Sequence, residues 1–268
     1  FQHQKSTVQQ FYLLIGKAFP YNEVRFAGGL QTAITNGFSL PTIGDLGSDN
    51  MLASEDYDHL NMVAAIGRLP YKTTDQLQLY LTKLKARDQA FKAGNTSEEN
   101  AWMKKIIYVN GGQPGQSDQA SINSFQRSTS NTISTNTFSA YTSFYQKSTT
   151  DPIGPIVDEF FANVNKGASI VDYFGHGSII DLAIQLERPN QYANSAKFPF
   201  LIIRGCNAGN IHAVQECVSE RVLTGTDFED RGYIAVIGSA GKSTIGQLGV
   251  LGQNFYNLLG GDLYGKTM

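Results

Sequence analysis

Short apolar runs alternate with stretches of helical character through the second half of the chain, and this alternation restricts the possible folds most. Strands are predicted at residues 106–109, 138–145, 169–174, 200–204 and 233–238. Helices are predicted at residues 117–128, 155–164, 216–224 and 248–259. Strands and helices in this order build a mainly parallel sheet that is covered by helices on both faces. The sequence therefore predicts an α/β fold.

The first hundred residues carry fewer such elements. Residues 11–15 and 62–66 are short apolar runs and are predicted strands. Thr73 and Gln76 have the spacing of a capping box, and leucines then repeat at helical intervals until Gly94, which predicts a helix there. Two strands and one helix predict a smaller α/β unit in this part of the chain.

A polar stretch at residues 95–100 separates the two parts of the chain. We predict a smaller N-terminal α/β subdomain over residues 1–97, and a second subdomain with the mainly parallel sheet over residues 98–268. The Ser-, Thr- and Asn-rich residues 128–137 are predicted to form a loop or a polar strand edge.

Charge and the length of the apolar runs argue against two classes of partner. With 21 Lys and Arg against 23 Asp and Glu, the chain lacks the positive charge that nucleic-acid binding needs, so no nucleic acid is predicted. The longest apolar run, residues 199–203, is far shorter than the roughly 20 residues of a membrane-spanning helix, so no membrane insertion of this segment is predicted. A start at Phe1 without a signal peptide predicts a processed segment of a longer protein.

A histidine and a cysteine follow two consecutive apolar strands. The run at residues 170–174 leads into His176, and the run at residues 200–203 leads into Cys206. Ligands bind beyond the carboxyl ends of parallel strands, so both side chains are expected at the same edge of the sheet. An imidazole that takes the thiol proton makes a cysteine nucleophilic. The N–H groups of Gly177 and Cys206 are natural donors to an oxyanion, and acyl transfer on peptides suits this set of groups.

Each of the two residues also fits a structural role. A single buried Cys is usually a small hydrophobe, and a His after a strand is often hydrogen-bonded in the core. Because His176 and Cys206 both follow apolar strands and both stand in glycine-rich turns, the pair favours catalysis.

Residues 173–178, Tyr-Phe-Gly-His-Gly-Ser, and the apolar strand that ends before Cys206 resemble the gingipain family of the caspase-like clan of cysteine peptidases. The similarity extends to residues 65–70, 207–209, 217–220 and 230–239. The resemblance implies a caspase-like fold and a cysteine endopeptidase, with a thioester acyl-enzyme on Cys206 and His176 as general base.

The same resemblance bears on partners and location. It implies a protein or peptide substrate, and it requires no organic cofactor. It also implies a protein secreted to, or held at, the surface of the outer membrane of a Bacteroidetes-type bacterium through type IX secretion. The oligomeric state stays open.

Two positions depart from the gingipain pattern. Gingipains place an acid after the first strand of the catalytic subdomain to orient the histidine, whereas Asn110 stands here. Asn110 either orients the imidazole through its amide oxygen or is a turn residue. Asp118 resembles the acid that binds the basic substrate side chain in arginine-specific members, or it is an acid stabilised at a helix N-terminus. The expected aromatic residue is missing from residues 242–245, so the P1 preference stays open.

An acidic loop precedes the second predicted strand, and its acids are Asp45, Asp49, Glu55, Asp56 and Asp58. Calcium prefers several oxygen ligands, and members of the resembled family bind it. Asp45, Asp49 and Asp56 are therefore the candidate ligands of a structural calcium ion, and a solvated acidic loop is the alternative.

Other sites fit the sequence less well. Residues 238–244 resemble a phosphate-binding loop, but Val236 stands where that motif needs glycine. Cys217, His59 and His212 are predicted to be structural or surface residues. Two alternatives to a peptidase stay open: a non-catalytic caspase-like module of a surface or secretion apparatus, and a sortase-like transpeptidase that passes the acyl group to an amine.

Overall fold

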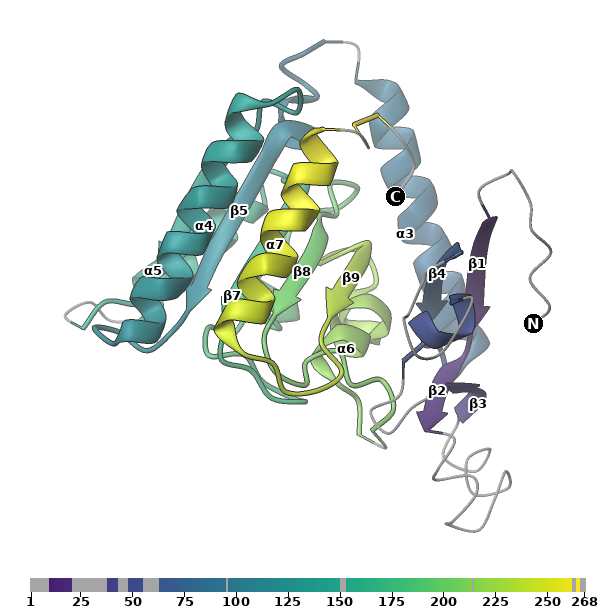
Figure 1. The fold of residues 1–268 in the computed structure, drawn as a ribbon. Coiled ribbons are helices and arrows are strands. Elements are labelled where there is room, and N and C mark those ends of the chain that lie inside the picture. The colour runs from purple at the N-terminus through teal and green to yellow at the C-terminus, as the bar shows by residue number, and fades with distance from the viewer. Residues whose placement is uncertain are drawn as a thin grey trace.

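The computed structural model describes residues 10–20, 38–42, 48–54, 63–94, 96–149, 153–213, 215–261 and 264–265. Within these ranges a five-stranded sheet with flanking helices lies beside a smaller part, which consists of two two-stranded sheets and one long helix (Figure 1). None of the helices described there is long and apolar enough to cross a bilayer.

The five-stranded sheet is parallel throughout. Its strands are β5 Lys105–Gly111, β6 Tyr141–Gln146, β7 Ile170–Gly175, β8 Phe200–Arg204 and β9 Ala235–Gly238. They stand in the order β6-β5-β7-β8-β9, and every neighbouring pair runs in the same direction. In β5 every residue after Lys105 is buried, as expected of a strand that is covered on both faces. The predicted α/β fold with a mainly parallel sheet is confirmed.

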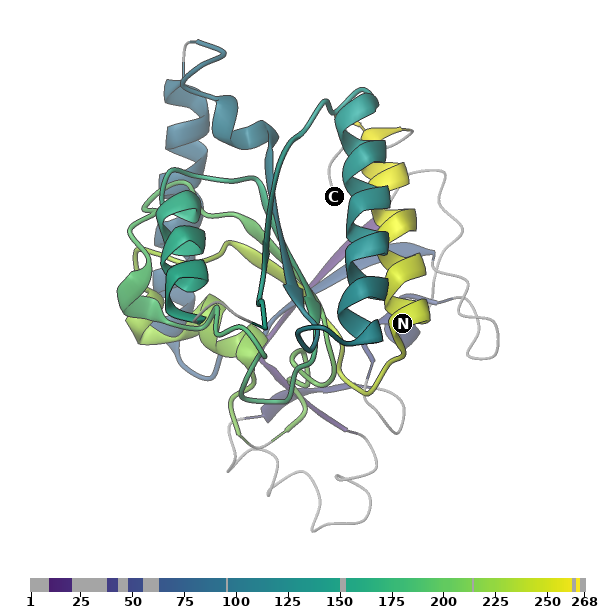
Figure 2. The same cartoon turned by 90° about the vertical axis from the view of Figure 1, so that its left-hand side faces the viewer.

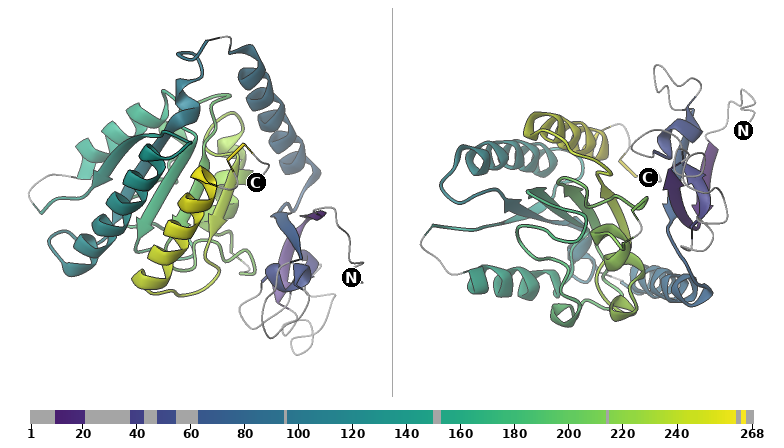
Figure 3. Two further views of the ribbon diagram at one scale, coloured as in Figure 1. Left: turned by 45° about the horizontal axis from the view of Figure 1, so that its top comes forward. Right: turned by 90° about the horizontal axis from the view of Figure 1, so that it is seen from below.

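Two pairs of helices cover the two faces of this sheet (Figures 2 and 3). The helices are α4 Ser117–Thr135, α5 Ile153–Val164, α6 Val218–Thr224 and α7 Ile245–Gly260. Tyr108 packs with Tyr256 of α7 on the face that α4 and α7 share, whereas its neighbour Val109 packs with Phe160 of α5 on the opposite face. Side chains alternate between the faces of a strand, so β5 contributes to both cores.

The smaller part comes from the N-terminal residues. Strands β1 Gln10–Ile15 and β4 Ala64–Leu69 pair in parallel, as do β2 Lys17–Pro20 and β3 Phe38–Thr42. The helix α3 Thr74–Ala93 follows, and its predicted capping box is confirmed: Gln76 N donates to Thr73 Oγ1, and Thr73 N donates to Gln76 Oε1, each over 3.3 Å.

A buried ion pair joins the two parts. Lys17 of β2 lies 2.9 Å from the carboxylate of Glu220 in α6, and both side chains are at most 2% exposed. Arg87 of α3 donates from Nε to the carbonyl oxygen of Phe198, over 3.1 Å. The boundary between residues 97 and 98 stays a prediction.

The prediction of a loop or a polar strand edge is wrong for residues 128–135, because α4 continues to Thr135. Hydroxyl groups of this segment donate to carbonyl oxygens one turn earlier: Thr129 to Phe125 over 3.1 Å and Thr135 to Asn131 over 2.8 Å. Ile133 is fully buried in the core that α4 shares with α7. Since the hydroxyls are satisfied inside the helix and one face is packed, the polar composition does not end it.

Smaller differences concern strand limits. The second predicted strand lies at Ala64–Leu69, a shift toward the C-terminus, and strands β2 and β3 were not predicted. The strand predicted from residue 138 begins only at Tyr141, because Ser139 adopts a left-handed φ of 52° and interrupts the extended backbone.

Candidate active site

His176 and Cys206 leave the sheet side by side. Strands β7 and β8 pair in phase, with Phe174 opposite Arg204. Gly175 ends β7 and Gly205 follows β8, and the candidate residue comes directly after each glycine. A Cβ atom added to Gly177 would lie 3.2 Å from the carbonyl oxygen of Cys206. The two turns therefore touch, and the predicted meeting of both residues at one sheet edge agrees with this geometry.

The imidazole of His176 is oriented by Asp118. Nε2 lies 2.9 Å from Asp118 Oδ2, and the imidazole side chain is 58% exposed. The backbone of His176 is held as well, because its N–H donates to the carbonyl oxygen of Gly111 over 3.2 Å, and its own carbonyl accepts from Ala183 N over 3.1 Å and from the Tyr173 hydroxyl. The imidazole ring is thus open to solvent, while the backbone of His176 is held in place by hydrogen bonds.

Asp118 stands in the first turn of α4, just beyond the carboxyl end of β5. Its Oδ2 also accepts from the backbone N–H of Gln113 over 2.9 Å, and its Oδ1 is buried without a hydrogen-bond partner among the described residues. Burial acts to raise the pKa of Asp118, but the hydrogen bonds from Gln113 and His176 outweigh it, so the pKa lies below its usual value. The carboxylate is therefore ionised when it faces the imidazole at neutral pH.

Asn110 lies at the same sheet edge but serves the turn. Its Nδ2 donates to the carbonyl oxygen of Gln119 over 2.9 Å, and its Oδ1 accepts from Gly112 N over 3.0 Å. Within the described part of the chain, Asn110 makes no hydrogen bond to His176. Asn110 thus has the turn role, one of the two that the sequence left open, and the residue that the structure brings to the imidazole is Asp118. Asp118 lies in the first turn of the helix that follows β5, and this position was the signal that could have identified it.

Cys206 stands at the start of a tight turn. Its Sγ is 3.8 Å from the carbonyl oxygen of Ser243, to which the thiol donates, and no hydrogen bond joins this thiol to His176 among the described residues. Asn207 has a left-handed φ of 57°, and its N–H donates to Gly241 O over 3.0 Å. The loop that follows β9 thus fixes the turn that carries the thiol. Hydrogen bonds between catalytic groups often tighten only when substrate binds.

Two backbone N–H groups at this edge, those of Gly177 and Cys206, are candidates to bind an oxyanion. In the bridge between Gly177 and Leu182, the hydrogen bonds are made by the neighbouring residues Ser178 and Ala183. Neither Gly177 nor Cys206 donates its backbone N–H to another described residue. Both groups are therefore available to a negatively charged oxygen at this edge.

Comparison with known proteins identifies the family of the chain. The model of peptidase family C25 matches residues 1–267. The chain belongs to peptidase family C25. No curated protein matches it.

Solved structures agree on the fold of this C25 chain. The complex of the pro- and mature domains of RgpB from Porphyromonas gingivalis is 17% identical, with a TM-score of 0.66 over 96% of this chain and 55% of that chain. The Arg-specific cysteine proteinase gingipain R is 14% identical, with a TM-score of 0.65 over 96% of this chain and 68% of the other. The C25 chain thus spans little more than half of the first of these proteins.

The second thiol of the C25 chain is in a different environment. Cys217 is fully buried at the start of α6, where its N–H donates to Glu220 Oε2 over 3.0 Å. Burial, together with the nearby Glu220 carboxylate, raises the pKa of the Cys217 thiol to about 12. Cys206 is only partly buried, so it is the thiol that an outside molecule can reach.

The candidate calcium ligands are only partly described. Both carboxylate oxygens of Asp49 accept hydrogen bonds from Arg68, each over 2.7 Å. Asp45 and Asp56 lie outside the described residues, as does His59. No group of three or more His, Cys, Asp or Glu that could hold a metal ion occurs in the described part of the chain. Calcium binding stays a prediction, and Asp49 already has a cationic partner.

Proposed function

We propose that this C25 chain is a cysteine peptidase that cleaves peptide bonds through a thioester on Cys206, with His176 as the general base. The observation that carries the proposal is the in-phase pairing of β7 and β8, which sets His176 beside Cys206 at the carboxyl edge of the sheet. Family C25 membership and the fold of gingipain R support the same function.

The proposed reaction begins with transfer of the Cys206 proton to His176. The thiolate attacks the peptide carbonyl, a C–S bond forms, and the N–H groups of Gly177 and Cys206 donate to the oxyanion. The C–N bond then breaks, and the leaving amine takes the proton from the imidazolium. Water, deprotonated by His176, attacks the thioester; the C–S bond breaks, and the proton returns to the thiol.

Asp118 has a defined place in this reaction. When Nε2–H of His176 donates to Asp118, the other ring nitrogen, Nδ1, carries the lone pair that accepts the Cys206 proton. One oxygen of the carboxylate is shared by His176 and Gln113, and the other is buried. Asp118 is therefore better suited to orient the imidazole than to bind a basic P1 side chain. A carboxylate at the histidine also weakens the case for a non-catalytic module.

The proposal also covers the substrate and the location of the whole protein. The resemblance to gingipains supports a protein or peptide substrate and a protein that is secreted or held at the bacterial surface. It equally supports export by type IX secretion from a Bacteroidetes-type bacterium. The chain contains a histidine, a thiol and an acid at one edge, and the proposal needs no organic cofactor.

Alkylation by iodoacetamide at neutral pH, read by intact mass and peptide mapping, tests the proposal. We expect labelling at Cys206, a sharp fall in its rate in His176→Ala, and no label at Cys217. Cleavage of a quenched fluorescent peptide library should disappear in Cys206→Ala. Equal labelling of both thiols, or a Cys206 rate that does not depend on His176, would refute the proposed catalytic pair. An active thiol that passes the acyl group to an added amine, but not to water, would indicate transpeptidation.

A further inference from the structure

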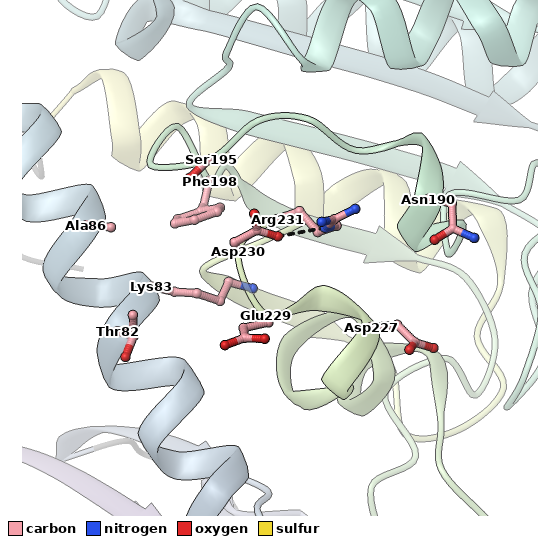
Figure 4. Close-up of a pocket in the computed structure, with 10 residues that line it drawn as sticks. All are labelled: Thr82, Lys83, Ala86, Asn190, Ser195, Phe198, Asp227, Glu229, Asp230 and Arg231. Carbon is pink, nitrogen blue, oxygen red and sulfur yellow. Dashed lines mark hydrogen bonds and ion pairs between the residues drawn. The ribbon is translucent and has the colours of Figure 1, made fainter.

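A pocket lies at the opposite edge of the sheet from His176 and Cys206. It encloses about 560 Å³ between α3 and the segments that precede β8 and β9 (Figure 4). Phe198 and Arg231, which line it, both come before their strands, at the amino ends of β8 and β9. The candidate catalytic residues follow the carboxyl ends of their strands, so the pocket is a separate site.

Lys83 of α3 is the buried group of this pocket. The residue is only 2% exposed, and its Nζ makes no hydrogen bond to any described residue. The Nζ lies 5.2 Å from the centroid of the Phe198 ring, which stabilises a cation but satisfies none of its N–H donors. In Figure 4 the side chain reaches from α3 toward Glu229 and Asp230. A buried amine without an acceptor is costly, and a ligand with an acceptor group would remove that cost.

The charges around Lys83 restrict the ligand. Arg231 Nε lies 2.8 Å from Asp230 Oδ1, so these two side chains offset each other. Asp227 and Glu229 also line the pocket; both are exposed, and neither pairs with a basic group among the described residues. The pocket thus has an amine at its buried side and two free carboxylates nearer to solvent. The carboxylates would repel a ligand that is only an anion, and the Lys83 amine would repel a ligand that is only a cation.

We propose that this pocket binds the zwitterion of an amino acid or a short peptide, with the carboxylate on Lys83 and the ammonium group on Glu229. The carboxylate supplies the acceptor that Lys83 lacks, and the ammonium group neutralises the free Glu229 carboxylate. Burial lowers the pKa of Lys83 to about 7 in the free protein, so a bound carboxylate restores the charged amine. The assignment does not depend on the proposed catalysis, because the two sites share no residue.

Calorimetric titration of the whole chain with glycine, glycylglycine and triglycine tests the proposal, with acetate and ethylamine as the two half-ligands. We expect at least one zwitterion to bind about tenfold tighter than either half-ligand, and the length series to distinguish an amino acid from a peptide. Lys83→Met should weaken this binding by about tenfold or more, while Lys85→Met, an exposed change on the same helix, should leave it unchanged.

Other outcomes overturn the proposal. Acetate that binds as tightly as the zwitterions would show a plain anion site, and ethylamine that does so would show a plain cation site. Lack of heat with every probe, or binding that survives Lys83→Met, would remove the site altogether. Glu229→Gln changes an exposed side chain, so it tests the ammonium end even if Lys83→Met fails to fold. Asp227→Asn, an exposed change that points away from Lys83 in Figure 4, is the matched control and should leave binding unchanged.

Discussion

His176 and Asp118 lie 58 residues apart in sequence, yet Nε2 of the imidazole and Oδ2 of the carboxylate are 2.9 Å apart. The contact exists because β5 and β7 are neighbours: Asp118 lies in the first turn of the helix that follows β5, and His176 directly follows β7. The imidazole therefore meets a carboxylate whose own position is fixed by the Gln113 N–H. A fixed carboxylate selects one tautomer of the ring.

Replacing Asp118 by Asn should lower kcat of the proposed reaction by about 10²-fold or more, with a smaller change in KM, because the amide does not select the reactive tautomer. Asp118→Glu should recover part of the rate. Asp181→Asn, an exposed change in the loop after His176, is the matched control and should retain full activity.

Steady-state kinetics with a peptide found in the library screen would measure these effects. An unchanged kcat in Asp118→Asn would remove Asp118 from the mechanism. A large rise in KM for basic P1 peptides alone would instead return Asp118 to the role of a substrate-binding acid.

The two thiols should differ in alkylation. The pKa of Cys217 is raised to about 12 by burial, so its thiolate is scarce below that pH, and the folded chain also covers it. We expect one iodoacetamide adduct on the folded protein at pH 8 and two in urea, with intact mass as the readout. Folded Cys206→Ala should take none. Two adducts on the folded wild type would contradict the burial of Cys217.

A side chain at position 177 should lower catalytic activity. A Cβ there would lie 3.2 Å from Cys206 O and 3.3 Å from Leu182 Cδ2, so Gly177→Ala should push the histidine turn away from the nucleophile turn. We expect kcat to fall by about tenfold or more, since small displacements of catalytic groups are costly. The melting temperature should change little, because the turn is at the surface.

Gly246 in α7 provides the matched control for this substitution. A Cβ at Gly246 would meet no atom within 4 Å, so Gly246→Ala should keep full activity and stabilise the helix by up to about 1 kcal/mol. Equal activity of the two alanine variants would show that the approach of Gly177 to Cys206 has no role in catalysis.

Much of this arrangement followed from local sequence signals, and the remainder depends on tertiary contacts. The His176 and Cys206 turns were predictable because apolar strands and glycines mark them directly. The sequence left Asn110, which is nearer to the strand end, open as a partner of His176 or as a turn residue, since sequence spacing does not show that the Asn110 amide is used by Gln119 and Gly112. A strand end identifies candidates, but hydrogen bonds with the following turn decide which one faces the site.

The same limit explains why the pocket at Lys83 could not be predicted from the sequence. Lys83 occupies a helix position between exposed residues, and a lysine there is expected to reach solvent. Only the packing of α3 against the segment at Phe198 and against Asp230 buries its amine. Burial of a polar group by a distant segment leaves no periodic trace in the sequence, so Lys83 could not be identified in advance.

Burial of Lys83 should make the stability of the protein depend on pH. The pKa falls from 10.5 to about 7 because burial disfavours the charged amine, although the Asp230 carboxylate acts in the opposite direction. Glu229 and Arg231 also line the pocket that Lys83 faces. Between about pH 7 and the normal lysine pKa, the unfolded chain binds a proton that the folded chain does not. The free energy of unfolding therefore rises with pH through this window. Below the window the folded protein bears the full cost of burying the charged Lys83 amine.

Lys83→Met removes this penalty and should be more stable than the wild type by a few kcal/mol at pH 6, given about 1.4 kcal/mol per pKa unit. The gain should shrink steadily from pH 7 to pH 10, as the wild-type amine loses its proton in the folded state. Urea denaturation at fixed ionic strength measures both chains across this range. Lys85→Met should show no such trend, because its side chain is exposed. A difference between Lys83→Met and wild type that stays constant with pH would mean that Lys83 keeps its charge in the folded protein. The Lys83 amine would then already have a hydrogen-bond acceptor in the folded protein, and it would not need the carboxylate of a ligand.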